Sequence, residues 1–218
     1  MQDYKSPLEM FYNWEKETPN KLYMRQPINS EWHHWTWSET ATQVRKMATY
    51  LKSLDFPDNS KIATLSKNCS HWIISDLAIM MAGHVSVPLY PNLKSDSIRQ
   101  ILEHSEAKLL FVGKLDDFES MRPGVPKDLP CVAFPFYSEE GYPVWDDLIK
   151  DIEPMTENVV RQPNELATII YTSGTTGMPK GVMHKFYNFS FATSNAVPLL
   201  GLATEERFFS YLPLCHIC

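Results

Sequence analysis

The residues best suited to chemistry lie together at 171–181, in the sequence YTSGTTGMPKG. Glycines permit positive φ angles and let backbone amides approach a ligand closely, hydroxyl groups donate hydrogen bonds to phosphate oxygens, and lysine adds a mobile positive charge. This combination predicts a phosphate-binding loop. We expect the phosphate contacts to come from Thr172, Ser173, Gly174, Thr175, Thr176, Gly177, Lys180 and Gly181.

The loop differs from two other phosphate-binding patterns. A Walker A loop has glycine directly before its lysine, whereas two residues separate Gly177 from Lys180. A dinucleotide-binding fingerprint needs Gly-x-Gly, and no such triplet occurs in the sequence. A flexible glycine–serine linker is a third alternative, but polar surroundings are typical of a linker. Here the flanking stretches are apolar: 166–171 predicts a strand before the loop, and 186–198 predicts a helix after it. A loop between a strand and a helix is typical of a ligand site in α/β folds, so phosphate binding is favoured over a linker.

The segment YTSGTTGMPKGV at 171–182 resembles the signature of the adenylate-forming superfamily, which includes acyl-CoA synthetases, luciferases and nonribosomal peptide adenylation domains. Other stretches agree with that family in order and spacing, so the resemblance covers nearly the whole chain. They are TWSE at 36–39, VPLYP at 87–91, HSEAK at 104–108 and YLPLCH at 211–216. Within the family, LPLCHI at 212–217 is most similar to long-chain fatty acyl-CoA synthetases.

This resemblance implies a ligase that uses ATP, Mg²⁺ and coenzyme A and acts on a small carboxylic acid, expected to be a medium- or long-chain fatty acid. The acid would form an acyl-adenylate, from which coenzyme A would displace AMP. The expected catalytic residues are Lys180, on the phosphates, and His216, beside the acyl or adenylate group. Thr175 is the expected contact to magnesium. For His216 a position in the core beside the site stays open, because a single histidine after a strand is weak support for a role.

The sequence also departs from the family pattern. Where the family has Ser or Thr followed by His-x-Asn, residues 185–188 keep only Asn188. The family's later magnesium glutamate, ribose aspartate and C-terminal lysine have no counterpart in the 218 residues. We therefore expect residues 1–218 to be the truncated N-terminal portion of an AMP-binding domain, inactive alone. Two alternatives stay open: an adenylation module with a carrier protein or reductase as acceptor, and a non-catalytic nucleotide-binding module that ends at residue 218.

The elements that must position the loop alternate between strands and helices. Apolar strands are predicted at 62–65, 85–88, 109–112, 166–171 and 208–212, and helices after the caps Ser6 and Ser38, at 70–82 and at 95–104. This alternation predicts an α/β fold with a largely parallel sheet flanked by helices. Aromatic-rich stretches at 22–26 and 32–37 predict two antiparallel strands that pack on the core, and 123–142 predicts a loose excursion rich in turns.

Composition narrows the class of protein. The chain is 44% apolar, enough for a substantial core, and its net charge of −6 is not concentrated in blocks that would favour nucleic acid as a partner.

The N-terminus lacks the basic and apolar stretches of a secretory signal, so we expect a cytoplasmic protein. The apolar window 72–90 contains Asp76 and His84 and predicts a core helix and strand rather than a transmembrane segment; peripheral contact with a membrane is left open. The four cysteines are expected as thiols.

Overall fold

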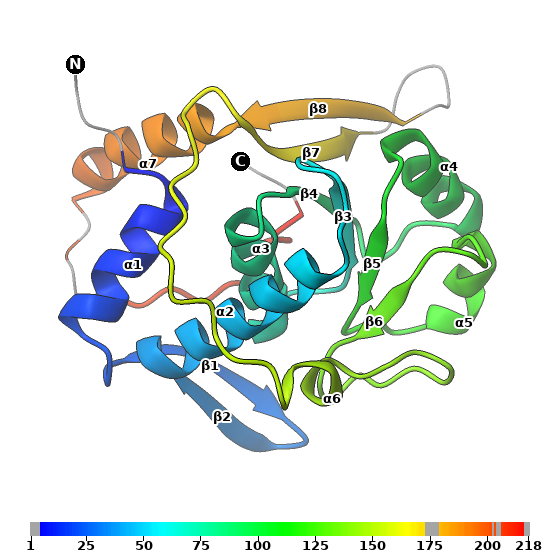
Figure 1. Cartoon of the computed structure of the whole chain (residues 1–218), viewed down its shortest axis with the longest axis horizontal. Helices are drawn as coiled ribbons and strands as arrows, with labels where there is room; N and C mark the ends of the chain where they lie inside the picture. Colours follow the sequence, from blue (N-terminus) through cyan, green and yellow to red (C-terminus); the bar gives the residue numbers. More distant parts are fainter. Residues whose placement is uncertain (1–4, 173–178, 202, 204–205, 216–218) are drawn as a thin grey trace.

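The structure is a computed structural model that describes residues 5–172, 179–201, 203 and 206–215. Helices and strands alternate along most of the chain (Figure 1). In order, they are α1 (Pro7–Glu17), β1 (Leu22–Ile28), β2 (Glu31–Thr36), α2 (Trp37–Ser53), β3 (Lys61–Leu65), α3 (Ser70–Met81), β4 (Val85–Leu89), α4 (Ser95–Ser105), β5 (Leu109–Val112), α5 (Phe118–Met121), η1 (Arg122–Gly124), β6 (Cys131–Ala133), α6 (Trp145–Ile149), β7 (Leu166–Thr172), β8 (Lys180–Lys185) and α7 (Phe186–Leu200).

A six-stranded sheet forms the centre of the molecule, in the order β6-β5-β3-β4-β7-β8. Each strand from β6 to β7 is parallel to its neighbour, whereas β8 at the edge is antiparallel to β7. The strands β1 and β2 form a separate antiparallel pair. The predicted α/β fold with a largely parallel sheet is therefore confirmed.

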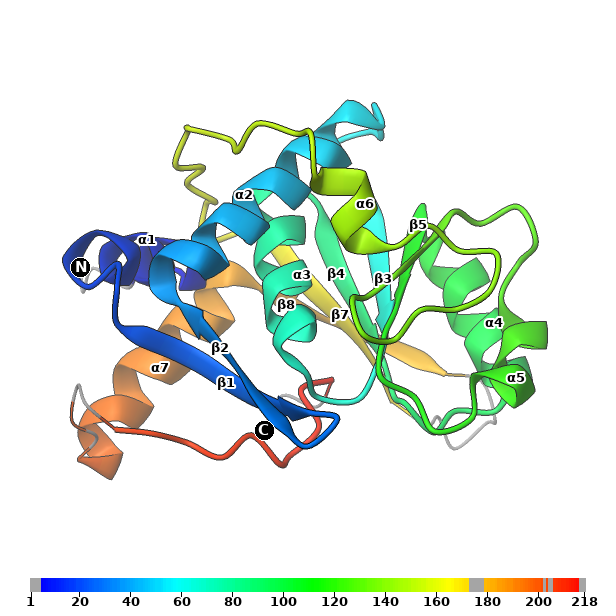
Figure 2. The same cartoon turned by 90° about the horizontal axis from the view of Figure 1, so that it is seen from below.

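Helices cover both faces of the sheet, and each face has its own apolar core. Along β5 the side chains alternate: Leu109 and Phe111 pack with α1, α2 and α3, whereas Leu110 and Val112 pack with α4 and α5. Figure 2 shows α2, α3 and α6 on one side of the strands and α4 and α5 on the other. Because both faces are covered, the central strands are largely apolar, as the sequence predicts for parallel strands.

The helix starts follow from local sequence. The predicted capping box at Ser6 is confirmed, with Glu9 as its reciprocal partner. The predicted cap of α2 at Ser38 is wrong, because the N-cap is Thr36: its side chain accepts from the amide of Glu39, and the Glu39 carboxylate accepts from the Thr36 amide at 2.8 Å. Threonine followed three residues later by glutamate is the capping-box spacing. Trp37 consequently belongs to α2 rather than to a strand.

Three strand predictions need correction. Strand β6 lies inside the predicted loose excursion, and its three residues between Pro130 and Phe134 are too few to show a pattern. Strand β8 was not predicted, since its sequence KGVMHK has little apolar character and pairs only at the sheet edge. Residues 208–212 are not a strand; Phe208, Phe209 and Tyr211 are each more than 70% exposed there.

The structure also bears on the cysteines and on membrane-spanning helices. Cys69, Cys131 and Cys215 are buried and carry free thiols, while Cys218 lies outside the described residues. In the part of the chain that the structure describes, no helix combines the length and the apolar character needed to cross a membrane.

Candidate nucleotide-phosphate site

The predicted phosphate-binding segment joins β7 to β8 at the edge of the sheet. Thr172 ends β7 and Lys180 begins β8; the two residues are partners in the antiparallel register and both are exposed. The five residues before Thr172 are buried, so the sheet holds β7 firmly up to the point where polar side chains begin. The carboxyl end of strands in a parallel sheet is where α/β folds bind ligands. The structure thus places two predicted phosphate contacts side by side at that end.

The other predicted site residues cannot be placed. Ser173, Gly174, Thr175, Thr176, Gly177 and His216 lie outside the described residues, so their contacts stay predictions. Within the described ranges, no three or more His, Cys, Asp or Glu side chains gather in a way that could hold a metal ion.

The backbone of Gly181 is not in the conformation that its residue type suggests. The sequence suggests positive φ, but Gly181 lies in β8, and it is not among the glycines with positive φ. Its contact with phosphate stays a prediction. A Cβ added there would lie 2.8 Å from Cγ2 of Ile169 and 3.2 Å from Cζ of Tyr171. Both distances are too short for ordinary contact. The glycine therefore leaves room for two side chains of β7 that cross over β8.

A buried arginine holds the base of this hairpin. Arg161 is 5% exposed, and its Nη1 donates to the carbonyl oxygens of Met80, at 3.0 Å, and His84, at 3.3 Å. Its Nε lies 3.3 Å from the carboxylate of Glu165, just before β7, and its guanidinium lies 5.0 Å from the ring centre of Phe186, just after β8. Arg161 thus ties the base of the hairpin to α3 and to the turn before β4. Sequence reasoning missed it, because a single arginine in a polar stretch forms no pattern.

Asn68 holds the segment that leads to His216. Its Nδ2 donates to the carbonyl oxygens of Ser210, at 3.1 Å, and Leu212, at 2.7 Å, and its Oδ1 accepts from the amide of Leu214 at 2.9 Å. Asn68 lies in the loop that joins β3 to α3, so this segment runs past the carboxyl end of the sheet. The residues around Asn68 match only the Asn-x-Ser pattern of glycosylation sites, which carries no information about this contact.

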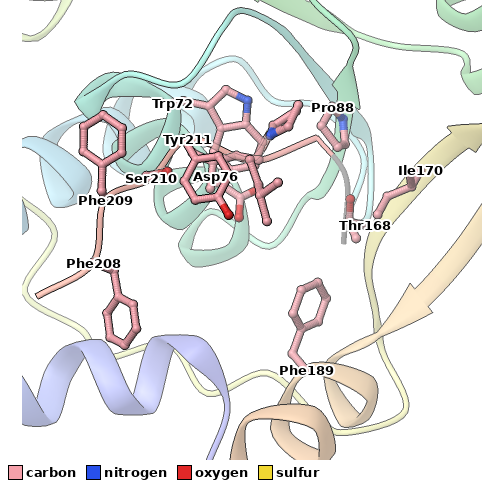
Figure 3. Close-up of a pocket in the computed structure, with 13 residues that line it drawn as sticks. Trp72, Asp76, Pro88, Thr168, Ile170, Phe189, Phe208, Phe209, Ser210 and Tyr211 are labelled. Carbon is pink, nitrogen blue, oxygen red and sulfur yellow. The ribbon is translucent and has the colours of Figure 1, made fainter. Parts of the chain in front are cut away.

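A cavity of about 570 Å³ lies between the sheet, α3, α7 and the segment at 208–214 (Figure 3). Its walls are mainly apolar and aromatic. They comprise Trp72, Asp76, Pro88, Thr168, Ile170, Phe189, Phe208, Phe209, Ser210, Tyr211, Leu212, Pro213 and Leu214. Because side chains alternate along a strand, Thr168 and Ile170 share a face of β7 with Thr172. At about 3.3 Å per residue, Thr168 is roughly 13 Å from Thr172. The cavity wall therefore continues along β7 toward the exposed pair Thr172 and Lys180.

Asp76 and Trp72 bring polar atoms to the mainly apolar walls. Burial raises the pKa of Asp76 to about 6, while a hydrogen bond from Ser86 acts in the opposite direction. Since the folded-state pKa lies above the usual value, ionisation of Asp76 destabilises the fold as the pH rises through about 6. The indole Nε1 of Trp72 is buried without a hydrogen-bond acceptor among the described residues. The cavity is thus least polar when Asp76 is protonated.

The sequence and the fold match known ligases. The sequence profile described as "AMP-binding enzyme" matches residues 11–218. Long chain acyl-CoA synthetase 5 of Arabidopsis thaliana is 30% identical over 226 residues, which cover 93% of this chain and 34% of that protein. The 2-succinylbenzoate–CoA ligase of Bacillus licheniformis is 31% identical over 212 residues, covering 94% of this chain and 40% of that protein.

Solved structures agree on the fold. Acetoacetyl-CoA synthetase from Streptomyces lividans superimposes with a TM-score of 0.83 at 20% identity, over 97% of this chain and 35% of that one. The chain therefore spans between about a third and two fifths of the length of these proteins. The family profile covers nearly the whole chain, including the hairpin that carries Thr172 and Lys180. The chain belongs to the AMP-binding enzyme family.

Proposed function

We propose that the whole protein is an ATP-dependent acid–thiol ligase that converts a fatty acid into an acyl-CoA through an acyl-adenylate. The observation that carries this proposal is the paired position of Thr172 and Lys180 at the two ends of the signature segment. Family membership supports the use of a nucleotide. We further propose that residues 1–218 form the N-terminal portion of its AMP-binding domain.

In the proposed reaction, a carboxylate oxygen attacks the α-phosphorus, and the bond to the oxygen that bridges to the β-phosphorus breaks. Pyrophosphate leaves with that electron pair. The thiol sulfur of coenzyme A, after losing its proton, then attacks the acyl carbon, and AMP leaves. The exposed ammonium of Lys180 and the hydroxyl of Thr172 would stabilise the charge that builds up on the departing pyrophosphate. The backbone and side chains at 173–177 are proposed to complete this set of donors.

Mg²⁺ would bind at this site mainly through the phosphates of ATP, with few ligands from the protein. Bound Mg²⁺ would neutralise phosphate oxygens, and this ion commonly binds through phosphates with few protein ligands. The described residues near the hairpin offer hydroxyl and ammonium groups rather than a carboxylate cluster, in keeping with such binding. Thr175 is the proposed protein contact. His216 is proposed to lie beside the acyl or adenylate group, since Asn68 holds the preceding residues at the carboxyl end of the sheet.

The apolar cavity supports a fatty acid as the substrate. Burial of an alkyl chain stabilises binding by about 0.8 kcal/mol per methylene, and the wall formed by Ile170 and Phe189 offers such burial. On this wall an acid group directed along β7 would approach Thr172. The long-chain synthetase among the relatives agrees with this assignment, whereas the 2-succinylbenzoate ligase acts on a different acid. Cytoplasmic location and peripheral contact with a membrane stay predictions from the sequence.

A series of acids tests the substrate. With the whole protein, kcat/KM for acyl-CoA formation is expected to rise by about fourfold per added methylene along the short members of a series from acetate to palmitate, because each methylene buries more apolar surface. The series should include 2-succinylbenzoate and an amino acid. A maximum at acetate, at 2-succinylbenzoate or at the amino acid would contradict the fatty-acid assignment. Adenylate formation without acyl-CoA would instead indicate a carrier protein or reductase as acceptor.

A further inference from the structure

A contact between α4 and β7 lies directly beside the phosphate-binding segment. The side chain of Tyr171, the residue before Thr172, is 4% exposed, and its hydroxyl lies 2.7 Å from Nδ1 of His104 in the last turn of α4. The two rings meet edge to face, with centres 5.7 Å apart and planes at 88°. Burial raises the pKa of Tyr171, so its hydroxyl stays protonated and can donate to the imidazole.

Besides α4 and β7, the contact between His104 and Tyr171 depends on β8. Tyr171 is the register partner of Gly181, and a side chain at Gly181 would lie 3.2 Å from the Tyr171 ring. The glycine thus lets the tyrosine ring cross β8 toward α4. The next pair along the register is Thr172 with Lys180. A single side chain therefore links α4 to the pair that carries the proposed phosphate contacts.

Strand β8 requires support at this end. It lies at the edge of the sheet and pairs on one side only, with β7. Arg161 holds the opposite end of the hairpin, at Glu165 and Phe186. At the end that carries Lys180, the described contacts from outside the hairpin include the one between His104 and Tyr171. Edge strands with pairing on one side open more readily than central ones.

The geometry points to His104 as a positioning residue: by holding Tyr171 over Gly181, it fixes the pair Thr172 and Lys180 that flanks the phosphate-binding segment. The consequence for catalysis rests on the proposed function. His104 itself touches no substrate in this account. Its loss should affect steps that involve the nucleotide phosphates and leave binding of the carboxylic acid unchanged.

The first test measures the hairpin itself and does not depend on activity. Backbone amide hydrogen exchange is compared for the parent, His104→Ala and Tyr171→Phe at residues 166–172 and 180–185. We expect about three- to tenfold faster exchange near Lys180 in both variants, as for the loss of one hydrogen bond, and unchanged exchange near Lys185. Glu103→Ala, an exposed neighbour on α4, is the matched control and should leave exchange unchanged. His104→Asn, which can restore a donor or acceptor near the Nδ1 position, should recover part of the protection.

The second test uses the whole protein and acid-dependent exchange of pyrophosphate into ATP. Both variants are expected to lower kcat/KM for ATP by about three- to tenfold, with KM for the acid changed by less than about twofold. The Tyr171 hydroxyl also has a side-chain hydrogen bond with Ser105. The double variant should therefore be no worse than Tyr171→Phe alone, which already removes the contact with His104.

Each outcome decides a different claim. Unchanged hydrogen exchange in His104→Ala, or in both variants, overturns the positioning role, whatever the activity. Additive effects in the double variant, or an equal loss for acid and ATP, overturn it as well. A parent protein without acid-dependent exchange of pyrophosphate contradicts the proposed function instead, and hydrogen exchange still decides the role of His104.

Discussion

Replacing Lys180 with alanine is expected to slow acid-dependent adenylate formation by the whole protein about ten- to a hundredfold. Lys180 begins β8 opposite Thr172, and its exposed ammonium is free to approach phosphate oxygens. The loss of a charge-assisted contact costs about 1.5–3 kcal/mol, which corresponds to this change in rate. The contact stabilises the departing pyrophosphate, so binding of the acid should change little. Exchange of labelled pyrophosphate into ATP, at varied concentrations of acid and of ATP, measures both effects.

Lys185 offers a matched control for that experiment. It ends the same strand and is also exposed, but at about 3.4 Å per residue it lies roughly 17 Å from Lys180, at the other end of β8. Lys185→Ala removes the same charge and should leave the exchange rate within about twofold of the parent. Equal losses in the two variants would mean that the overall charge, and not a contact at Lys180, is responsible. An unchanged rate in Lys180→Ala would remove this residue from the site.

Replacing Trp145 with alanine is expected to lower the free energy of unfolding by about 3–5 kcal/mol, the largest stability effect that we predict for a single residue. Trp145, at the start of α6, is fully buried against Phe111 and Phe134, with ring centres 5.3 and 5.8 Å away. Its indole Nε1 also donates to Oε1 of Gln43 at 2.9 Å. Alanine leaves a cavity at the junction of β5, β6 and α2. Denaturant-induced unfolding followed by circular dichroism measures the change.

Trp32 is the control for tryptophan as a residue type. It is 55% exposed, and the centre of its ring lies 4.8 Å from the guanidinium carbon of Arg25. A cation–π contact at an exposed site contributes only about 0.5–1 kcal/mol, so Trp32→Ala should cost no more than that. Similar losses of unfolding free energy in Trp32→Ala and Trp145→Ala would contradict a stabilising role for the burial of Trp145.

The sequence is most informative where one local pattern determines the structure. Alternation of apolar strands and helices predicts the sheet and its covering helices, because strands buried on both faces are largely apolar. The strand that leads to Thr172 and the helix from Phe186 are predicted from their apolar stretches, and both are confirmed. The capping box at Ser6 is likewise a purely local signal.

The sequence is least informative where a contact joins distant segments. Arg161 and Asn68 each bind backbone atoms far away along the chain, and such contacts leave no mark on their own neighbourhoods. The strand β8 is stable only because β7 pairs with it, so its own composition predicts a loop. For Gly181 the residue type indicates freedom of the backbone, whereas the structure uses the missing side chain to admit Tyr171.

Transfer of oxygen from the acid to AMP tests the central claim most directly. The whole protein is incubated with ATP, Mg²⁺, coenzyme A and palmitate whose carboxylate is labelled with oxygen-18. Mass spectrometry then measures how many labelled oxygens the nucleotide and phosphate products carry. If a carboxylate oxygen attacks the α-phosphorus, the AMP released by the thiol carries one labelled oxygen, and pyrophosphate carries none. Unlabelled AMP, or ADP with the label in inorganic phosphate, would contradict adenylate formation by this protein.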